Sequence, residues 1–121
     1  MRKTTKAAVA VALSAGALTV VGVTSAQAAG TAEGCPSGAV CIYPQDAGWN
    51  GGHPSLFFYS YGAHNLSNQY GHHYVFNNQT GGAKMRSCTG YNGTGCGSGY
   101  LPAGTYDNPD LTPINSITLE P

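Results

Sequence analysis

Short apolar runs separated by glycine-rich turns are the feature that most constrains how this chain can fold. After residue 29, no segment keeps an apolar period of 3.6 residues for a dozen positions, so no long amphipathic helix is expected. Five runs instead have the composition of β-strands: AVCIY (39–43), SLFFY (55–59), HYVF (73–76), AKMRSC (83–88) and NSITL (115–119). Turn clusters such as QDAGWNGG and NNQTGG lie between them. The sequence therefore predicts an all-β sandwich or small barrel.

The first 28 residues have the pattern of a secretory signal peptide. Three basic residues precede an apolar run (7–23), and an A-x-A cleavage motif follows at 26–28. A transmembrane anchor is the alternative, but polar and glycine residues interrupt the apolar run. We therefore expect residues 1–28 to be removed and residues 29–121 to form one secreted, extracellular domain.

The expected mature part is mildly acidic. The leader holds three of the five basic residues, which leaves Lys84 and Arg86 against all five acidic side chains. Two cations cannot neutralise a phosphate backbone, and no polybasic patch for anionic lipid remains. We therefore expect no nucleic-acid partner and no membrane attachment after cleavage of the leader, and we expect the domain to be a monomer.

The four cysteines occur as two close pairs, Cys35 with Cys41 and Cys88 with Cys96. Outside the cell, an even number of cysteines indicates disulfides rather than metal ligands or redox centres. Four cysteines allow three pairings, and we expect the local one because about half of the domain separates the two pairs. Each short ring would contribute about 2–3 kcal/mol to the stability of a small domain.

The two halves of the domain form a weak internal repeat. The first half (40–78) and the second half (83–121) each contain a strand next to a cysteine, a glycine-rich excursion and a closing strand. Each half has about the size of a four-stranded Greek-key unit, and two such units make one sandwich.

The segment CPSGAVCIYPQDAGWNGG resembles the opening of the βγ-crystallin-like secreted proteins that are grouped with the streptomycete metalloproteinase inhibitor. Members of that group begin with two cysteines around a Pro-x-Gly turn, followed by a strand with tyrosine and an aromatic-x-Gly corner. The matching residues here are Cys35, Pro36, Gly38, Cys41, Tyr43, Trp49 and Gly51. The resemblance implies a βγ-crystallin-like sandwich of two Greek-key motifs.

The resemblance also implies a site for protease inhibition. In the inhibitor group the reactive bond follows the first cysteine of a disulfide-closed loop, which corresponds to the Cys88–Thr89 bond in the ring that Cys96 closes. The implied reactive-site loop is Cys88, Thr89, Gly90 and Tyr91, with Tyr91 as a natural anchor because tyrosine offers a large contact area. Thr89 is smaller and more polar than the residue that thermolysin-like proteases prefer, and the glycines predict a loose ring.

Three functions remain open from the sequence. The first is a peptidase inhibitor, with metalloproteases as expected targets, that presents the disulfide-closed loop to an extracellular protease. The second is a carbohydrate-binding or cell-surface-binding module, for which Trp49 and exposed tyrosines would be the platform. The third is a purely structural secreted protein, in which the disulfide-closed loop only stabilises the fold.

Neither a metal site nor a catalytic centre is expected. His72 and His73 would point to opposite faces of a strand, and no HExxH motif is present. The positions of the crystallin calcium motifs lack the carboxylate that a hard cation needs; these positions are Tyr70-Gly71 with Tyr74-Val75, and Leu111-Thr112 with Asn115-Ser116. We therefore expect no enzymatic activity, no cofactor and no bound metal.

Overall fold

The computed structural model describes residues 30–121, and the expected signal peptide (1–28) lies outside the described residues. The described part contains seven strands and one short 3-10 turn: β1 (Ala39–Ile42), η1 (Asn50–Gly52), β2 (Leu56–Phe58), β3 (Gly62–Asn65), β4 (Val75–Asn78), β5 (Lys84–Cys88), β6 (Thr105–Asp107) and β7 (Ser116–Glu120). Within residues 30–121, no helix is long and apolar enough to cross a membrane. The prediction of an all-β fold is confirmed.

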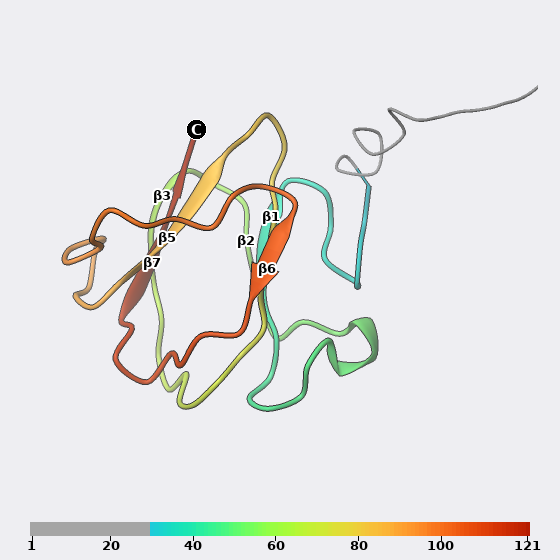
Figure 1. Cartoon of the computed structure of the whole chain (residues 1–121), viewed down its shortest axis with the longest axis horizontal. Coiled ribbons are helices and arrows are strands. Elements are labelled where there is room, and N and C mark those ends of the chain that lie inside the picture. Colours follow the sequence, from blue (N-terminus) through green and yellow to red (C-terminus); the bar gives the residue numbers. More distant parts are fainter. Residues whose placement is uncertain (1–29) are drawn as a thin grey trace, which may run out of the picture.

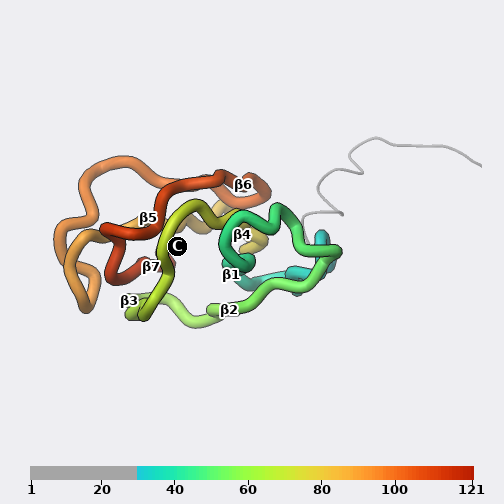
Figure 2. The backbone as a smooth tube through the Cα atoms, turned by 90° about the horizontal axis from the view of Figure 1, so that it is seen from below, coloured from blue at the N-terminus to red at the C-terminus, as the bar shows by residue number. Residues whose placement is uncertain are grey.

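The strands form two antiparallel sheets. In Figure 1 the sheet that contains β1, β2 and β6 lies to the right, and the sheet of β3, β5 and β7 lies to the left. The strand order is β2-β1-β4-β6 in the first sheet and β3-β7-β5 in the second. By sequence β3 belongs to the first half of the domain, yet it pairs with β7, and β6 of the second half pairs with β4. Figure 2 shows the same division from below. Each half therefore contributes one strand to the sheet of the other half.

Alternation along β1 explains why this strand is buried on both faces. Val40 and Ile42 belong to the main core, whereas Ala39, Cys41 and Tyr43 belong to a second apolar cluster. The main core is completed by residues from both sheets and their connections: Leu66, Val75, Met85, Leu111, Ile117 and Leu119. A strand that is covered on both faces is expected to be continuously apolar, as AVCIY is.

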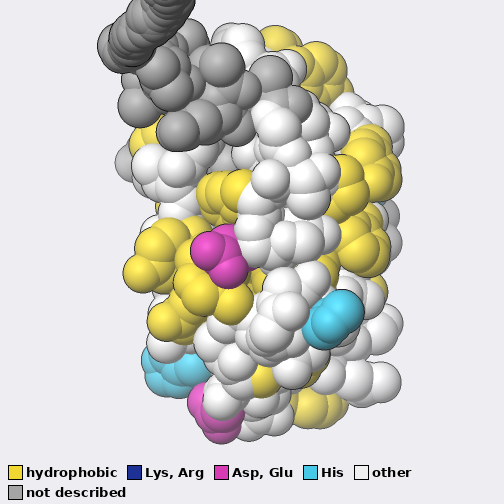
Figure 3. Space-filling view, turned by 90° about the vertical axis from the view of Figure 1, so that its right-hand side faces the viewer, with side chains coloured by type: hydrophobic (Ala, Val, Ile, Leu, Met, Phe, Trp, Pro, Cys, Tyr) yellow, Lys and Arg dark blue, Asp and Glu magenta, His cyan; other side chains and the backbone are white. Residues whose placement is uncertain are grey.

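Aromatic rings pack around Trp49 in the second cluster. The Trp49 ring meets Tyr43, Tyr74 and Phe76 edge-on with centroid distances of 4.9–5.6 Å, and it leans against Tyr106 at 4.7 Å. Figure 3 views the molecule from the right-hand side of Figure 1 and shows hydrophobic side chains gathered there. Trp49 is half-buried among four rings, so much of its surface is used in packing within the domain.

Two of the seven strands have no β-type pattern in the sequence. GAHN of β3 and TYD of β6 are mostly exposed, and each lies at the edge of its sheet. They are strands because they pair with β7 and β4, which shows that tertiary pairing decided their conformation rather than intrinsic propensity.

The turn predicted at NNQTGG begins later than expected. Asn77 and Asn78 belong to β4 and are buried. Asn77 Nδ2 donates to the carbonyls of Ala83 and Leu101, and Asn78 Nδ2 donates to two carbonyls of the segment that precedes β1. The amides remain in the interior because their donors are satisfied there.

Candidate functional site

Both expected disulfides are present. Cys35 pairs with Cys41 and Cys88 pairs with Cys96, and no cysteine between residues 30 and 121 is free. The local pairing predicted from the spacing is confirmed. The ring of residues 88–96, called the disulfide loop from here on, lies at the surface and holds all four residues of the implied site.

The disulfide loop is a short hairpin. Thr89 N–H donates to the carbonyl of Gly95 at 3.1 Å, and Gly90 N–H donates to the carbonyl of Thr94 at 2.9 Å. At the tip, Thr94 donates to Tyr91 O from its N–H at 3.3 Å and from its hydroxyl at 2.9 Å. The loop therefore has backbone hydrogen bonds across the ring, although no strand is formed between its two cysteines.

The tip of the loop is an Asn-Gly turn. Asn92 and Gly93 have φ values of 59° and 75°, and two central residues with positive φ are the requirement of a type I′ hairpin turn. A Cβ atom on Gly93 would lie 3.0 Å from Thr118 Cγ2 and 3.1 Å from Ala63 Cβ. Gly93 thus lets the loop fold down onto the second sheet, where a larger residue would collide with Thr118 and Ala63.

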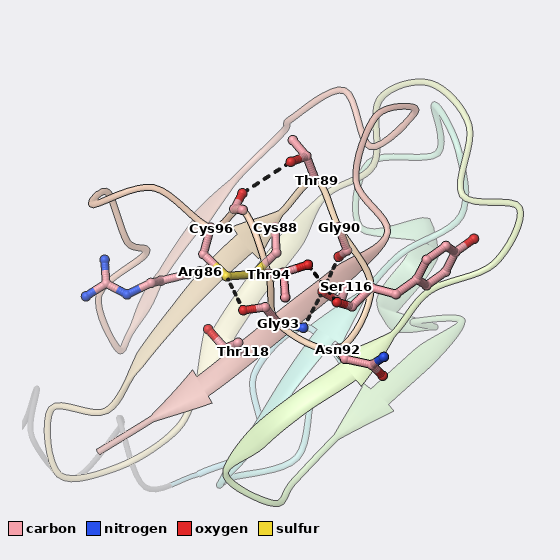
Figure 4. The surroundings of a disulfide bond; sticks show 12 residues. Arg86, Cys88, Thr89, Gly90, Asn92, Gly93, Thr94, Cys96, Ser116 and Thr118 are labelled. Atoms are coloured by element: carbon pink, nitrogen blue, oxygen red, sulfur yellow. Dashed lines mark hydrogen bonds between the residues drawn. A yellow bond between two sulfur atoms is a disulfide. The ribbon is translucent and has the colours of Figure 1, made fainter.

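Ser116 and Asn115 hold the loop from below. Ser116 Oγ donates to Gly90 O at 2.7 Å and accepts from Gly93 N–H at 3.0 Å, while Asn115 Nδ2 donates to Thr89 O at 2.8 Å. Figure 4 shows the loop folded over β7 with Ser116 beneath it. The sequence analysis named Asn115 and Ser116 as the start of an expected strand and as the place of a missing calcium motif. No local pattern points to their contacts with the loop.

A pair of asparagines ties the loop to β3. Asn65 Oδ1 accepts from Asn92 N–H at 2.7 Å, and Asn65 Nδ2 donates to Asn92 Oδ1 at 3.0 Å. This reciprocal contact fixes the tip at a second point, on β3, where Asn65 is the register partner of Ser116 in β7. The turn that carries Tyr91 is therefore fixed from two strands.

The implied reactive bond, Cys88–Thr89, is hydrogen-bonded on both sides. The carbonyl of Cys88 accepts from Asn115 N–H at 3.0 Å, and Thr89 N–H pairs with Gly95 as described above. The Thr89 side chain is exposed, and the Tyr91 side chain is 55% exposed. The structure thus places Cys88, Thr89, Gly90 and Tyr91 on one ordered loop whose backbone is engaged and whose two larger side chains face solvent.

Arg86 fixes the chain that follows the loop. Its Nε donates to the two carboxylate oxygens of Glu120 at 3.0 and 3.2 Å, and its Nη1 donates to the carbonyls of Ser98 and Gly99 at 2.6 and 3.2 Å. The hydrogen bond from the Thr118 hydroxyl, followed by Arg86, holds the pKa of Glu120 below its ordinary value. The guanidinium thereby links the second sheet to the segment behind Cys96.

The histidines and carboxylates are spread over the domain. Within residues 30–121, no three His, Cys, Asp or Glu side chains lie together as metal ligands do. His72 is exposed, whereas His73 is buried with its ring nitrogens 2.6 Å from Tyr43 O and 2.9 Å from Tyr70 O. Hydrogen bonds from Thr112, first from its side chain, lower the pKa of Asp110.

No protein-family model, curated protein or solved structure that was compared with the chain matches it. The class of the protein is therefore described from its fold and its disulfides alone. The chain forms a small all-β domain with two antiparallel sheets and two local disulfides, a construction consistent with an extracellular protein.

Proposed function

We propose that the protein is a secreted, monomeric peptidase inhibitor that presents the disulfide loop to an extracellular protease, with a metalloprotease as the expected target. The observation that carries the proposal is the order of an exposed loop. Its backbone is paired internally and fixed by Asn65, Asn115 and Ser116, while Thr89 and Tyr91 face solvent. A loop that is ordered before binding loses little conformational entropy in a protease cleft.

Tyr91 is the anchor in this proposal. It immediately precedes the Asn-Gly turn, and a partly exposed tyrosine on a fixed backbone can bury a large area with little loss of rotamer freedom. Thr89 lies two residues earlier on the same arm of the hairpin. Together they offer one large and one small contact to neighbouring pockets of a cleft.

The Cys88–Thr89 bond is expected to resist hydrolysis. Cleavage requires the carbonyl to turn toward a catalytic metal or oxyanion site, and it requires the amide nitrogen to become a leaving group. Both atoms are held by Asn115 and Gly95, and the disulfide keeps the two ends of the loop together. The loop would therefore bind in the protease cleft without being cleaved.

A protease panel tests this function. Thermolysin-like, subtilisin-like and papain-like proteases are titrated with the disulfide-bonded protein, and intact mass is measured after long incubation. We expect a tight 1:1 complex with one class and no gain of a water molecule in the loop. Tyr91→Ala should weaken inhibition about tenfold or more. Tyr61→Ala is the matched control, because Tyr61 is similarly exposed (58%) outside the loop.

Substitutions of Thr89 test the implied reactive bond. If Thr89 fills the pocket after the scissile bond, Thr89→Leu should strengthen inhibition of a thermolysin-like protease several-fold, by roughly 1 kcal/mol. Thr89→Asp should abolish it because a buried unpaired carboxylate is costly. Equal inhibition constants across this series would place the contact elsewhere on the loop, and a panel with no inhibited protease would refute the proposed function.

We also propose that the two halves are Greek keys of the βγ-crystallin-like kind that the resemblance implied. The first sheet places β1 between β2 and β4, and the halves exchange β3 and β6. An isolated bridge between Met85 and Leu101 lies at the edge of β5 that is not paired with β7, where a fourth strand of the second sheet would belong. An experimental structure superposed on a crystallin domain would test this assignment.

A further inference from the structure

A polar cavity of about 190 Å³ lies beside the disulfide loop. It is formed by the segment after β3, the segment before β7 and the disulfide loop, which it borders through Tyr91 and through Asn115, the residue that donates to Thr89 O. Its polar side chains come from Ser67, Asn68, Gln69, Thr112 and Asn115, and among the described residues no charged side chain lines it. We propose that this cavity is a binding site for a neutral saccharide.

The lining amides have hydrogen-bonding capacity to spare. Gln69 Nε2 donates to Ser67 O at 2.9 Å, which leaves its carbonyl oxygen without a partner within residues 30–121. Asn115 Nδ2 is used by the disulfide loop, so its oxygen is likewise unpaired there. Asn68 accepts from the Tyr70 hydroxyl, and its NH₂ group has no partner in the described chain. One end of each amide is thus fixed and the other is open, an arrangement that suits hydroxyl groups, which both donate and accept.

Two tyrosines flank these amides. Tyr70 and Tyr91 line the cavity and are 60% and 55% exposed. Tyr70 lies on a backbone that His73 contacts at its carbonyl, and Tyr91 precedes the turn that Asn65 fixes. An aromatic ring presents an apolar face and a polar tip. The C–H face of a sugar ring can pack on such a surface while its hydroxyls reach the amides.

The chemistry of the lining disfavours charged and apolar ligands. A charged ligand would enter without a counter-charge from the lining, so its desolvation would not be compensated. An apolar side chain in the cavity would shield the open amide groups from water without offering them hydrogen bonds, which costs free energy. The volume suits about one sugar ring, so a longer saccharide would extend past the tyrosines into solvent. This site does not depend on protease inhibition, although Tyr91 belongs to both surfaces.

The first experiment is an NMR titration of the ¹⁵N-labelled, disulfide-bonded protein. The probes are cellohexaose, xylohexaose and N-acetylchitohexaose, with oligogalacturonate as a charged comparison. We expect a neutral oligosaccharide to shift the side-chain NH₂ signals of Asn68, Gln69 and Asn115. The proposal is overturned if no neutral probe moves these signals at millimolar concentration, or if only oligogalacturonate does.

Substitutions then separate this site from other exposed aromatics. Tyr70→Ala should weaken binding about tenfold, Gln69→Ala should weaken it several-fold, and the control Tyr61→Ala should leave it unchanged. Gln69→Ala keeps the test valid if Tyr70→Ala fails to fold. Binding that survives both cavity variants, or that is lost in Tyr61→Ala, would assign the saccharide to another surface. Because Tyr70 lies outside the disulfide loop, its variant should still inhibit a protease, so the two proposals can fail separately.

Discussion

The two disulfide rings have similar lengths, with sequence separations of 6 and 8, but different forces hold them. In the first ring, Cys35, Ala39 and Cys41 have no exposed area and pack with Tyr43 and Phe76 in the second apolar cluster. The disulfide loop exposes most of its side chains and is held by hydrogen bonds from Asn65, Asn115 and Ser116. The same cross-link therefore supports packing in one ring and loop geometry in the other.

This difference follows from residue type. Apolar residues in the first ring gain free energy from burial, which is roughly proportional to the area removed from water. The glycine, threonine and asparagine residues of the disulfide loop gain little from burial, and polar contacts contribute about 1 kcal/mol each. The first ring should matter most for folding, and the second should matter most for what the surface can bind.

Removing the first cross-link should have the largest effect on stability. In Cys35→Ala/Cys41→Ala we expect the free energy of unfolding to fall by about 3–5 kcal/mol, because ring closure and core packing are lost together. Urea denaturation measures the change. A loss below about 1 kcal/mol would mean that the second cluster packs without this disulfide and would remove the contrast between the rings.

Removing the second cross-link should cost about 2 kcal/mol, since little apolar area depends on it. In Cys88→Ala/Cys96→Ala the sheets should persist, as shown by unchanged amide shifts in β1 and β4. Limited proteolysis should then cut within the disulfide loop, and protease inhibition should drop. A loss of stability larger than that of the first double variant would contradict the comparison.

Ser116→Ala should cost about 1–2 kcal/mol, because it leaves the Gly90 carbonyl and the Gly93 N–H without their partner. Hydrogen exchange at Gly93 should speed up while exchange in the first sheet stays unchanged. Ser87→Ala is the matched control. Ser87 immediately precedes Cys88 of the Cys88–Cys96 disulfide, and its hydroxyl makes no hydrogen bond within residues 30–121. Equal exchange at Gly93 in both variants would show that Ser116 does not hold the loop.

Tyr43→Phe should cost about 1 kcal/mol at neutral pH through loss of the 2.7 Å hydrogen bond to Glu33 O. Burial, followed by the charge of Glu33, raises the pKa of Tyr43 from 10.0 to about 12. Above pH 10 the unfolded chain loses this proton first, so stability should fall between pH 10 and pH 12. Thermal unfolding against pH should show a smaller alkaline loss in Tyr43→Phe, and parallel curves would count against the assignment.

Glu120→Gln should have the smallest effect, a few tenths of a kcal/mol, because the ion pair with Arg86 is partly exposed. The lowered pKa of Glu120 means that its contribution is present above the ordinary glutamate range and is lost as the pH falls through the lowered value. Acid titration of the melting temperature should therefore be flatter in the variant. If the variant instead loses several kcal/mol at neutral pH, Arg86 organises more of the fold than its contacts indicate.

The sequence predicted the interior better than the edges or the site. AVCIY (39–43) contains strand β1 because a continuously apolar run is buried on both faces. AKMRSC (83–88) contains β5 because its Met85 faces the core together with Leu119 of the partner strand. The edge strands β3 and β6 carry no such pattern, since their conformation comes from a neighbour that is distant in the sequence. The packing of Trp49 was not predictable for the same reason, because the rings that cover it come from other strands.

The cysteine spacing predicted the ring of the candidate site but not its order. Gly93 was interpreted from the sequence only through its flexibility, and the close approach to Thr118 and Ala63 that its small size allows was not predicted. The support from Asn115 and Ser116 is absent from any local pattern, because a hydrogen bond to a backbone atom far away in the chain leaves no periodic trace. The open amides near Tyr70 are invisible for the same reason.

The exchange of β3 and β6 between the halves makes folding a non-local process. Gly62–Asn65 must meet Ser116–Glu120, near the other end of the domain, before the second sheet can form, so loop closure precedes most of the stabilising contacts. Topologies of this kind fold slowly, and they resist division into independent pieces. Neither repeat should therefore be stable when it is expressed alone, but the two fragments should recombine when mixed, each providing the strand that the other lacks.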